Sequence, residues 1–389
     1  MKKQAVILCA IFLSAASRAE DGWETLPTTR KEDEVKNEKI LRGVPKAHYG
    51  AFGGITPFPT CLKAVSDYLG DELDYAYAMA ASGAAFRFAW NTAEWDGGNV
   101  DISHTYDDAE RAYRQGVTAL GRDFKILWRE KNSWNHPGAG TKDDIKAFIK
   151  TQIDAGRPLI SIGIIGPPEA AVITGYRDDG NVLLGWSFFQ QWMWRDFNGD
   201  GYFVNGAWEN DKDFVAVMSL GETAAPRMAA GPIIANAIAA LEGRQEGKHA
   251  KGVAAYDAWK KALLGAEEKD FAINPDWQQS IVAMCQGDAT DCLVDGRKNA
   301  SIWFKRLADE NPGQPLYAEI SAQFDVIAKT IHGEIYPLLG GWQRGPENNK
   351  RLESLETRQK IAAHIDAMKA ADERALALMR QLHALAAQE

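Results

Sequence analysis

Residues 170–190, AAVITGYRDDGNVLLGWSFFQ, consist of two short apolar runs joined by a turn sequence. The runs at 170–176 and 182–186 carry β-branched and large apolar residues, which are typical of strands. Between them, Asp178, Asp179 and Gly180 provide a hairpin turn signal. We therefore expect two antiparallel strands that are neighbours in one sheet.

Another apolar run, PLISIGII at 158–165, lies just before this hairpin. Gly166, Pro167 and Pro168 separate the run from the hairpin, because glycine and proline interrupt regular structure. We therefore expect a third strand at 158–165, and the three runs together form the predicted β core.

Helices are expected around this core from the spacing of the apolar residues. Their predicted positions are 61–69, 76–90 and 143–155. Pro59 and Thr60 mark the start of the first helix, and Gly70 marks its end. Thr141 is the expected N-cap of the helix at 143–155, and Gly156 terminates it.

The composition changes after Pro226. From there Ala, Leu, Glu, Lys and Arg dominate, and apolar residues recur at threes and fours, with the longest predicted helix at about 348–387. The sequence therefore predicts an α+β domain followed by an all-α helical domain. The expected boundaries are a signal peptide at 1–19, a flexible linker at 20–45, the α+β domain at 46–225 and the helical domain at 226–389.

The N-terminus has the three-part layout of a secretory signal. A basic start precedes an apolar run from Ala5 to Ala16, and small residues stand at Ser17 and Ala19. The run is shorter than the roughly 20 residues that cross a membrane. We expect cleavage after Ala19 and an exported protein, periplasmic or secreted, without an integral membrane span. An uncleaved N-terminal anchor is the alternative.

The chain is acidic, with 53 Asp and Glu against 44 Lys and Arg and a formal net charge of -9 at pH 7. A negative chain repels the phosphate backbone, so we expect no nucleic-acid partner. Hydrophobic residues make up 46% of the sequence, which contains 13 Trp. This composition indicates well-packed globular structure, and the length favours two domains.

Removal of the signal would leave Cys61, Cys285 and Cys292. Cys285 and Cys292 flank a segment, QGDATD, in which Gly287 and Asp288 can turn the chain, so we expect a short-loop disulfide in an oxidising compartment. Cys61 would then be unpaired. The alternative is that all three cysteines are reduced and buried. The sequence has no CxxC or Cys/His metal-binding pattern, and we expect neither a metal nor a cofactor.

Cys61 is a candidate nucleophile because of its predicted position at the start of a helix. There the positive end of the helix dipole lowers the pKa of a thiol and favours the reactive thiolate. The alternative is that Cys61 is a small apolar residue packed beneath the helix.

The order of a cysteine-bearing helix, a Gly-Pro strand entry and the hairpin at 170–190 resembles papain-like peptidases that trim bacteriocin leaders. A closer likeness is to the papain-like family that includes the N-terminal domain of butirosin biosynthesis protein H, an acyltransferase. CLKAVSDYLG, SGAAFRFAWN, GWSFFQ, GYFVNGAW and HAKGVAAYDAW carry this likeness, which covers about 48–260. The resemblance implies a papain-like fold for the α+β domain, with Cys61 at the position of the nucleophile.

The remaining members of a papain-like triad differ from the family pattern. The catalytic His of the family aligns with Glu169, and its Asp or Asn falls near Trp186 and Ser187. The Gln that donates a hydrogen bond to the oxyanion is absent from the segment before Cys61. The resemblance therefore implies the fold more strongly than the activity.

Glu169 stands between prolines and an apolar strand, where desolvation could raise its pKa enough for it to act as the base for Cys61. Alternatively, His104 or His48 could reach the cysteine from a loop. A structural role also stays open, in which Glu169 pairs with an Arg or caps a turn.

Residues 196–201, DFNGDG, match the opening of a calcium-binding loop. The twelfth position of such a loop carries a bidentate Glu, but here it is Ala207. We therefore interpret the segment as an ordinary hairpin turn that does not bind calcium.

Aromatic residues concentrate after the hairpin. They could line a binding cleft for an acyl chain, a sugar or a peptide, or they could be core residues. They are Trp186, Phe188, Phe189, Trp192, Trp194, Tyr202 and Trp208.

Two functions are compatible with these features. The first is a cysteine-dependent hydrolase or acyltransferase with Cys61 as nucleophile and Glu169, helped by a histidine such as His104, as base. The second is a non-catalytic module on a papain-like fold that binds a ligand or a protein. The expected partner in either case is a peptide, an acyl group or another small molecule.

Overall fold

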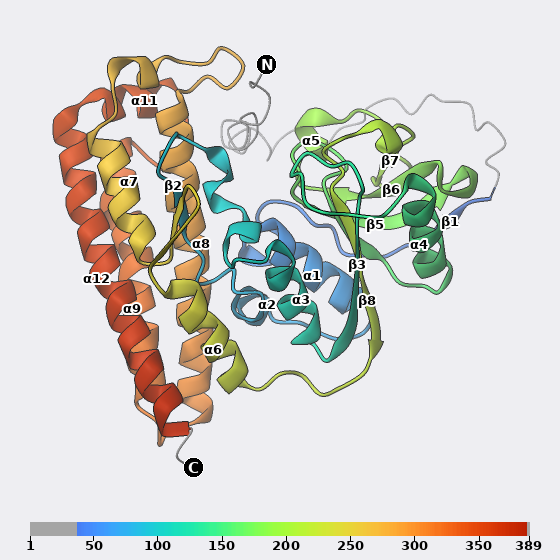
Figure 1. The fold of residues 1–389 in the computed structure, drawn as a ribbon, viewed down its shortest axis with the longest axis horizontal. Coiled ribbons are helices and arrows are strands. Elements are labelled where there is room, and N and C mark those ends of the chain that lie inside the picture. The colour runs from blue at the N-terminus through green and yellow to red at the C-terminus, as the bar shows by residue number, and fades with distance from the viewer. Residues whose placement is uncertain (1–36, 387–389) are drawn as a thin grey trace. The chain divides into compact units, whose positions relative to one another are not determined.

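The computed structural model describes residues 37–386, so the predicted signal peptide and its cleavage after Ala19 lie outside the described residues. The chain forms two compact units, each built from separate stretches of sequence (Figure 1). The sheet unit contains residues 37–78 and 116–227, and the helical unit contains residues 79–115 and 228–386. The helical unit thus includes residues 79–115, which the sequence analysis assigned to the α+β domain.

The sheet unit is built on an antiparallel sheet with the strand order β3-β8-β4-β5-β6-β7, and β1 also pairs with β5. The strands are β1 (Lys39–Ile40), β3 (Arg122–Trp128), β4 (Leu159–Ile162), β5 (Ala170–Arg177), β6 (Val182–Ser187), β7 (Phe203–Asn205) and β8 (Ala216–Thr223). β5 pairs with β6 across a short turn, which confirms the predicted hairpin. β4 pairs with β5 on the other side, so the predicted third strand is also confirmed.

Helices cover both sides of this sheet, with α1 on one side and α4 on the other (Figure 1). The helices that begin or end in this unit are α1 (Pro57–Tyr68), α2 (Tyr75–Ala81), α3 (Ala109–Thr118), α4 (Lys142–Asp154) and α5 (Gln190–Met193). The predicted helix at 143–155 is confirmed as α4. Thr141 and Asp144 form a capping box at its start, in which each side chain accepts a hydrogen bond from the other's backbone.

The predicted helix at 76–90 is wrong beyond Ala81. α2 ends there, and Gly83 adopts a positive φ of 82°. The chain then enters β2 (Ala89–Asn91), which pairs antiparallel with β10 (His249–Lys251). The alanine-rich sequence favours a helix locally, but pairing with a distant strand determines the structure.

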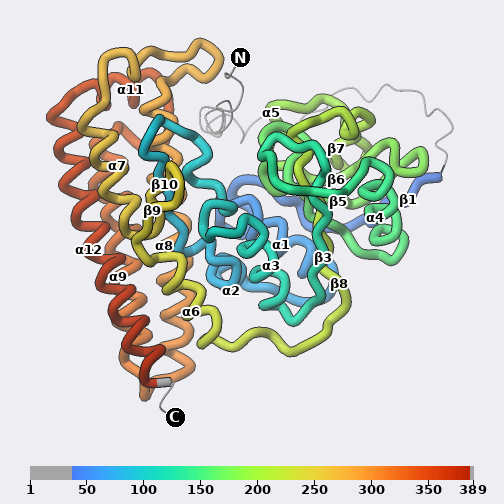
Figure 2. Tube along the Cα trace, in the orientation of Figure 1, coloured from blue at the N-terminus to red at the C-terminus, as the bar shows by residue number. Residues whose placement is uncertain are grey.

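The helical unit contains long helices that lie side by side and a small three-stranded sheet of order β2-β10-β9 (Figures 1 and 2). Its further elements are α6 (Ala230–Leu241), β9 (Arg244–Glu246), α7 (Ala254–Leu264), α8 (Ile281–Glu310), α9 (Leu316–Thr330), the π-helical turn η8 (Ile331–Ile335), α10 (Tyr336–Leu339), α11 (Pro346–Glu353) and α12 (Leu355–Ala386). The predicted helical C-terminal region is therefore confirmed, but β9 and β10 were not expected within it.

The long helix predicted at 348–387 is interrupted at Ser354, where the backbone is extended with φ −69° and ψ 119°. The Ser354 hydroxyl accepts a weak hydrogen bond from the backbone N–H of Thr357 at 3.4 Å. Serine is a favoured N-cap, and α12 begins directly after it. None of the helices within residues 37–386 combines the length and hydrophobicity that a membrane-spanning helix needs.

The predicted disulfide between Cys285 and Cys292 is wrong, because both cysteines lie inside α8 as free thiols. Seven residues of helix rise by about 10 Å, which exceeds the Cα separation of a disulfide. Gly287 does not turn the chain. A Cβ at this position would lie 2.3 Å from Arg344 Nε, so the glycine instead permits a close approach of the Arg344 side chain to the helix.

Short 3-10 turns complete the described chain. They are η2 (Ala51–Gly53), η3 (Gly97–Val100), η4 (Ile102–His104), η5 (Asp178–Gly180), η6 (Trp208–Asn210) and η7 (Glu268–Phe271). η5 joins β5 to β6 and contains Asp179 at a positive φ of 56°, which aspartate tolerates better than most residues.

Candidate functional site

Cys61 lies in the second turn of α1 and not in its first. The helix begins at Pro57, with Thr56 as N-cap, because proline at the first helical position costs no hydrogen bond. Thr60 Oγ1 also donates a hydrogen bond to the Thr56 carbonyl at 2.8 Å. The predicted start of the helix at Cys61 is therefore one turn too late. The effect of the helix dipole falls off within the first turn, so it is weak at this thiol.

The Cys61 side chain is completely buried, with 0% of its surface exposed. Burial raises the pKa of the Cys61 thiol well above its usual range, and the negative charge of Glu169 raises it further. This direction is opposite to the one expected from a helix start. At neutral pH the group is a protonated thiol in an apolar environment, which is a poor nucleophile.

Glu169 precedes β5 and lies close enough to Cys61 for its charge to act on the thiol. Its backbone is fixed on both sides, since its N–H donates to the Pro167 carbonyl at 2.7 Å and its carbonyl accepts from Gly163 at 2.8 Å. The fold therefore brings together two of the residues that the sequence analysis selected. The proposed role of Glu169 as a base stays a prediction.

His104 belongs to the helical unit, where it ends η4. Its ring stacks on His249, with the ring centroids 4.4 Å apart and the planes inclined by 29°. Burial lowers the pKa of His104 to about 4, and the positive charge of Lys251 contributes to this shift. The structure does not bring His104 into the same unit as Cys61.

His48, the other histidine considered as a base, lies in the sheet unit and is half-buried. Its Nδ1 is 2.7 Å from the carbonyl oxygen of Tyr49. Tyr49 packs edge-on against Phe188 at 4.7 Å and lies 6.0 Å from Trp192. The His48 ring is therefore held by the backbone of a residue whose own side chain packs against aromatic rings.

The end of β6 is organised by a glutamine that the sequence analysis did not select. Gln190 is 4% exposed. Its Oε1 accepts from the backbone N–H of Ser187 at 2.8 Å, and its Nε2 donates to the Gly201 carbonyl at 3.2 Å. Ser187 Oγ donates to the Ile165 carbonyl at 3.3 Å. These bonds hold the strand end in place and are structural in character.

Most of the aromatic cluster belongs to the core of the sheet unit. The members that are at most 8% exposed are Trp186, Phe188, Phe189, Tyr202 and Trp208. The indole N–H of Trp186 donates to the Val44 carbonyl at 3.1 Å, and that of Trp208 donates to the Gly180 carbonyl at 3.1 Å. Only the half-buried members remain candidates for lining a cleft, Trp192 and Trp194.

The segment that resembles a calcium loop forms a hairpin turn. Asn198 Oδ1 accepts from the backbone N–H groups of Asp200 and Tyr202, and Gly201 has a positive φ of 81°. An isolated bridge between Phe197 and Phe203 closes the turn. The predicted hairpin is therefore confirmed. Within the described part of the chain, no group of three or more His, Cys, Asp or Glu side chains could hold a metal ion.

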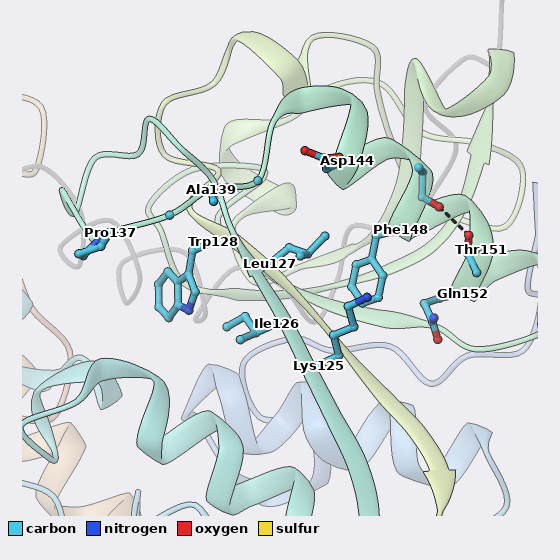
Figure 3. A pocket seen from close by; sticks show the side chains of 13 residues that line it. Lys125, Ile126, Leu127, Trp128, Pro137, Ala139, Asp144, Phe148, Thr151 and Gln152 are labelled. Carbon is cyan, nitrogen blue, oxygen red and sulfur yellow. Dashed lines mark hydrogen bonds between the residues drawn. The ribbon is translucent and has the colours of Figure 1, made fainter.

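An open groove of 610 Å³ lies between β3 and α4 in the sheet unit (Figure 3). Lys125, Ile126 and Leu127 line it from β3, and Ala147 and Phe148 line it from α4. The sequence analysis did not predict β3. The signal that could have found it is RDFKILW at 122–128, in which charged and apolar residues partly alternate after a glycine.

Comparison of the sequence with protein-family models gives no match. A search among curated proteins likewise gives no match. The geometry of the described residues is therefore the basis for the functional assignment.

Proposed function

We propose that the sheet unit is a papain-like module of an exported protein that acts by binding a peptide or protein segment and not by thiol catalysis. The observation that carries this proposal is the state of Cys61. Its side chain has no exposed surface, and both its burial and the charge of Glu169 favour the protonated thiol. A nucleophile must contact its substrate, and this thiol is sealed from solvent.

The arrangement around Cys61 supports the papain-like assignment. α1 carries the cysteine and packs against β4 and β5, and Glu169 stands at the entry to β5, where the family has its histidine. In this proposal, a carboxylate beside a buried thiol takes the place of the thiol and imidazole of the papain-like family. The negative charge of Glu169 disfavours the Cys61 thiolate, which is the opposite of an activated thiolate–imidazolium pair.

The experiment is iodoacetamide labelling of the native full-length protein at neutral pH, followed by peptide mapping to locate the label. We expect Cys61 to react far more slowly in the folded protein than after unfolding in denaturant, where labelling should be complete. Cys61→Ser should retain the fold and whatever binding activity the protein has. Rapid labelling of Cys61 in the folded protein would refute the proposal.

A cysteine hydrolase or acyltransferase is the second candidate, and the proximity of Glu169 to Cys61 favours it. The two accounts predict opposite effects of Glu169→Gln, which keeps the size of the side chain and removes its charge. If Glu169 is a base, its loss shifts thiol reactivity to higher pH. If Glu169 is only a neighbouring negative charge, its loss lowers the pKa of Cys61. The pH dependence of the slow labelling rate in the two proteins distinguishes these outcomes.

A further inference from the structure

β3 is the terminal strand of the sheet, so β8 is its only neighbouring strand within the described residues, and its other edge forms a single bridge, to Gly140 at the end of the strand. Its partner is β8, in the register Leu127 with Val217 and Lys125 with Ser219. An unpaired strand edge presents backbone N–H and C=O groups that can bind a further strand. β3 is therefore a structural site for strand addition.

The hydrogen-bond pattern identifies the backbone groups that point away from β8. Arg129 donates its N–H to the Val215 carbonyl at 3.0 Å, so the odd-numbered residues of β3 face β8. In an antiparallel pair the backbone groups of successive residues point to opposite sides. The N–H and C=O of Ile126 therefore point away from the sheet and into the groove.

The loop that contains residues 137–140 forms a bridge to this edge at one end of the groove. The N–H of Gly140 donates to the Trp128 carbonyl at 2.9 Å, and the Glu130 N–H donates to the Gly140 carbonyl at 3.0 Å. This single parallel bridge leaves the edge at Ile126 open. The loop is anchored, since His136 stacks on Trp128 with the ring centroids 3.7 Å apart. It therefore forms a fixed end wall beside the open part of β3.

α4 forms the opposite wall of the groove (Figure 3). Residues Asp144, Ala147, Phe148 and Thr151 lie three and four positions apart, so they share one face of the helix. Lys125 Nζ lies over the Phe148 ring, 5.1 Å from its centroid. Lys125 and Leu127 thus project toward α4, because alternate residues of a strand point to the same side of the sheet.

The charges in the groove indicate what kind of side chain fits there. Lys125 is exposed, and it forms no ion pair with another described residue. The carboxylate of Asp144, the other charged lining residue, accepts a hydrogen bond from the Thr141 hydroxyl at 2.6 Å within the capping box. A negative side chain opposite Lys125 would gain a cross-strand partner, and an apolar one opposite Leu127 would cover Phe148.

We propose that the groove between β3 and α4 binds an extended segment of a partner protein as an added strand beside Ile126. An acidic residue of the segment lies opposite Lys125, and an apolar residue two positions away lies opposite Leu127. This inference rests on the proposal that the sheet unit acts by binding, and it names the surface and the class of partner. Main-chain hydrogen bonds supply affinity, and the alternate side chains supply specificity.

The probe is a fluorescein-labelled peptide of about eight residues, close to the usual length of a strand. Glutamate and valine alternate at its groove-facing positions, and threonine fills the others. Binding to the full-length protein is measured by fluorescence anisotropy. Lys125→Glu should weaken binding about fivefold or more, because an attractive cross-strand pair becomes repulsive. Replacing glutamate by lysine in the peptide should restore binding to this variant.

Matched controls separate the groove from general charge effects. Lys212→Glu makes the same change of charge at an exposed position of the sheet unit that does not line the groove, and it should leave the affinity unchanged. Ala147→Trp fills the groove from an exposed helix position and should abolish binding. Thermal unfolding of each variant verifies that the fold is retained.

N-methylation of the peptide tests the strand geometry directly. Methylation of one N–H removes a hydrogen bond to β3, whereas methylation of the adjacent N–H affects a group that points to solvent. Only the peptides methylated at an N–H that faces β3, the first series, should lose affinity, and those methylated at a solvent-facing N–H, the second series, should not. Equal effects of the two series, or binding that neither Lys125→Glu nor Ala147→Trp alters, would overturn the inference. So would self-association of the protein that Lys125→Glu abolishes, because the occupant would then be a second copy of the chain.

Failure of this inference is distinguishable from failure of the proposed function. If the peptides do not bind but Cys61 remains unreactive, the groove is not the binding surface and the absence of thiol catalysis stands. If Cys61 reacts in the folded protein, the proposed function fails whether or not the peptides bind.

Discussion

Burial sets the charge state of the candidate residues. Removing a side chain from water disfavours its charged form, so burial raises the pKa of the Cys61 thiol and lowers the pKa of the His104 imidazole. Both groups are therefore neutral near pH 7. A catalytic cysteine or histidine can ionise near neutral pH. The surroundings of Cys61 and His104 in the fold, and not their residue types, keep these two side chains neutral.

The lowered pKa of His104 makes stability depend on pH. Its pKa in the folded protein is about 4 against an ordinary value of 6.5, so the unfolded chain binds more protons between these values. The stabilisation is fully present above pH 6.5 and is lost as the pH falls toward 4. A shift of this size corresponds to about 3 kcal/mol.

His104→Phe keeps a ring that can stack on His249 but cannot take up a proton. We expect the free energy of unfolding to fall less between pH 7 and pH 4 in this variant than in the unmodified protein. Urea titrations at several pH values measure the difference. His383→Phe, at an exposed position of α12, is the control and should leave the pH dependence unchanged. An identical loss of stability in His104→Phe and the unmodified protein would contradict the assignment.

Elements with strong local signals were predicted correctly, and elements that depend on distant partners were not. The hairpin of β5 and β6 has its own turn sequence, and α4 has its own cap at Thr141. β2, by contrast, forms in an alanine-rich segment because it pairs with β10. Gly287 was interpreted as a turn residue, but its lack of a side chain accommodates Arg344 against a continuous helix. The burial of Cys61 likewise follows from packing, which local spacing does not encode.

The cap of α4 offers a direct test at this scale, because α4 forms one wall of the groove. Thr141→Ala removes the side chain that accepts from the Asp144 N–H at 3.2 Å. We expect a loss of about 1 kcal/mol in the free energy of unfolding, together with weaker binding of the peptide probe. Thr151→Ala, at an exposed position of the same helix that also lines the groove, is a control for stability alone and should change the free energy of unfolding by less than about 0.5 kcal/mol. Equal effects of the two substitutions would argue against the capping box.

At the scale of the whole molecule, the chain passes between the units more than once. Residues 79–115 leave the sheet unit and fold with the C-terminal helices. Arg297, fully buried in α8, donates hydrogen bonds to the Ala85 carbonyl at 2.8 Å and to Asp372. The first half of the chain therefore contributes essential backbone to the helical unit.

This topology determines the result of limited proteolysis. Cleavage near 222–230 should yield two fragments, of which the N-terminal one still carries residues 79–115 and hence β2. We expect the fragments to elute together in size-exclusion chromatography under native conditions and to separate only in denaturant. Fragments that separate without denaturant would show that residues 79–115 are not integral to the helical unit.

The central claim, that Cys61 is a buried thiol in a binding module, is tested most directly by measuring its ionisation. The Cβ carbon-13 shift of isotope-labelled cysteine, assigned with Cys61→Ser, reports the thiol and the thiolate separately. The account predicts that the Cys61 signal keeps its thiol position throughout the pH range in which the protein stays folded, including above the free value of about 8.5. A transition to the thiolate at or below neutral pH would contradict it.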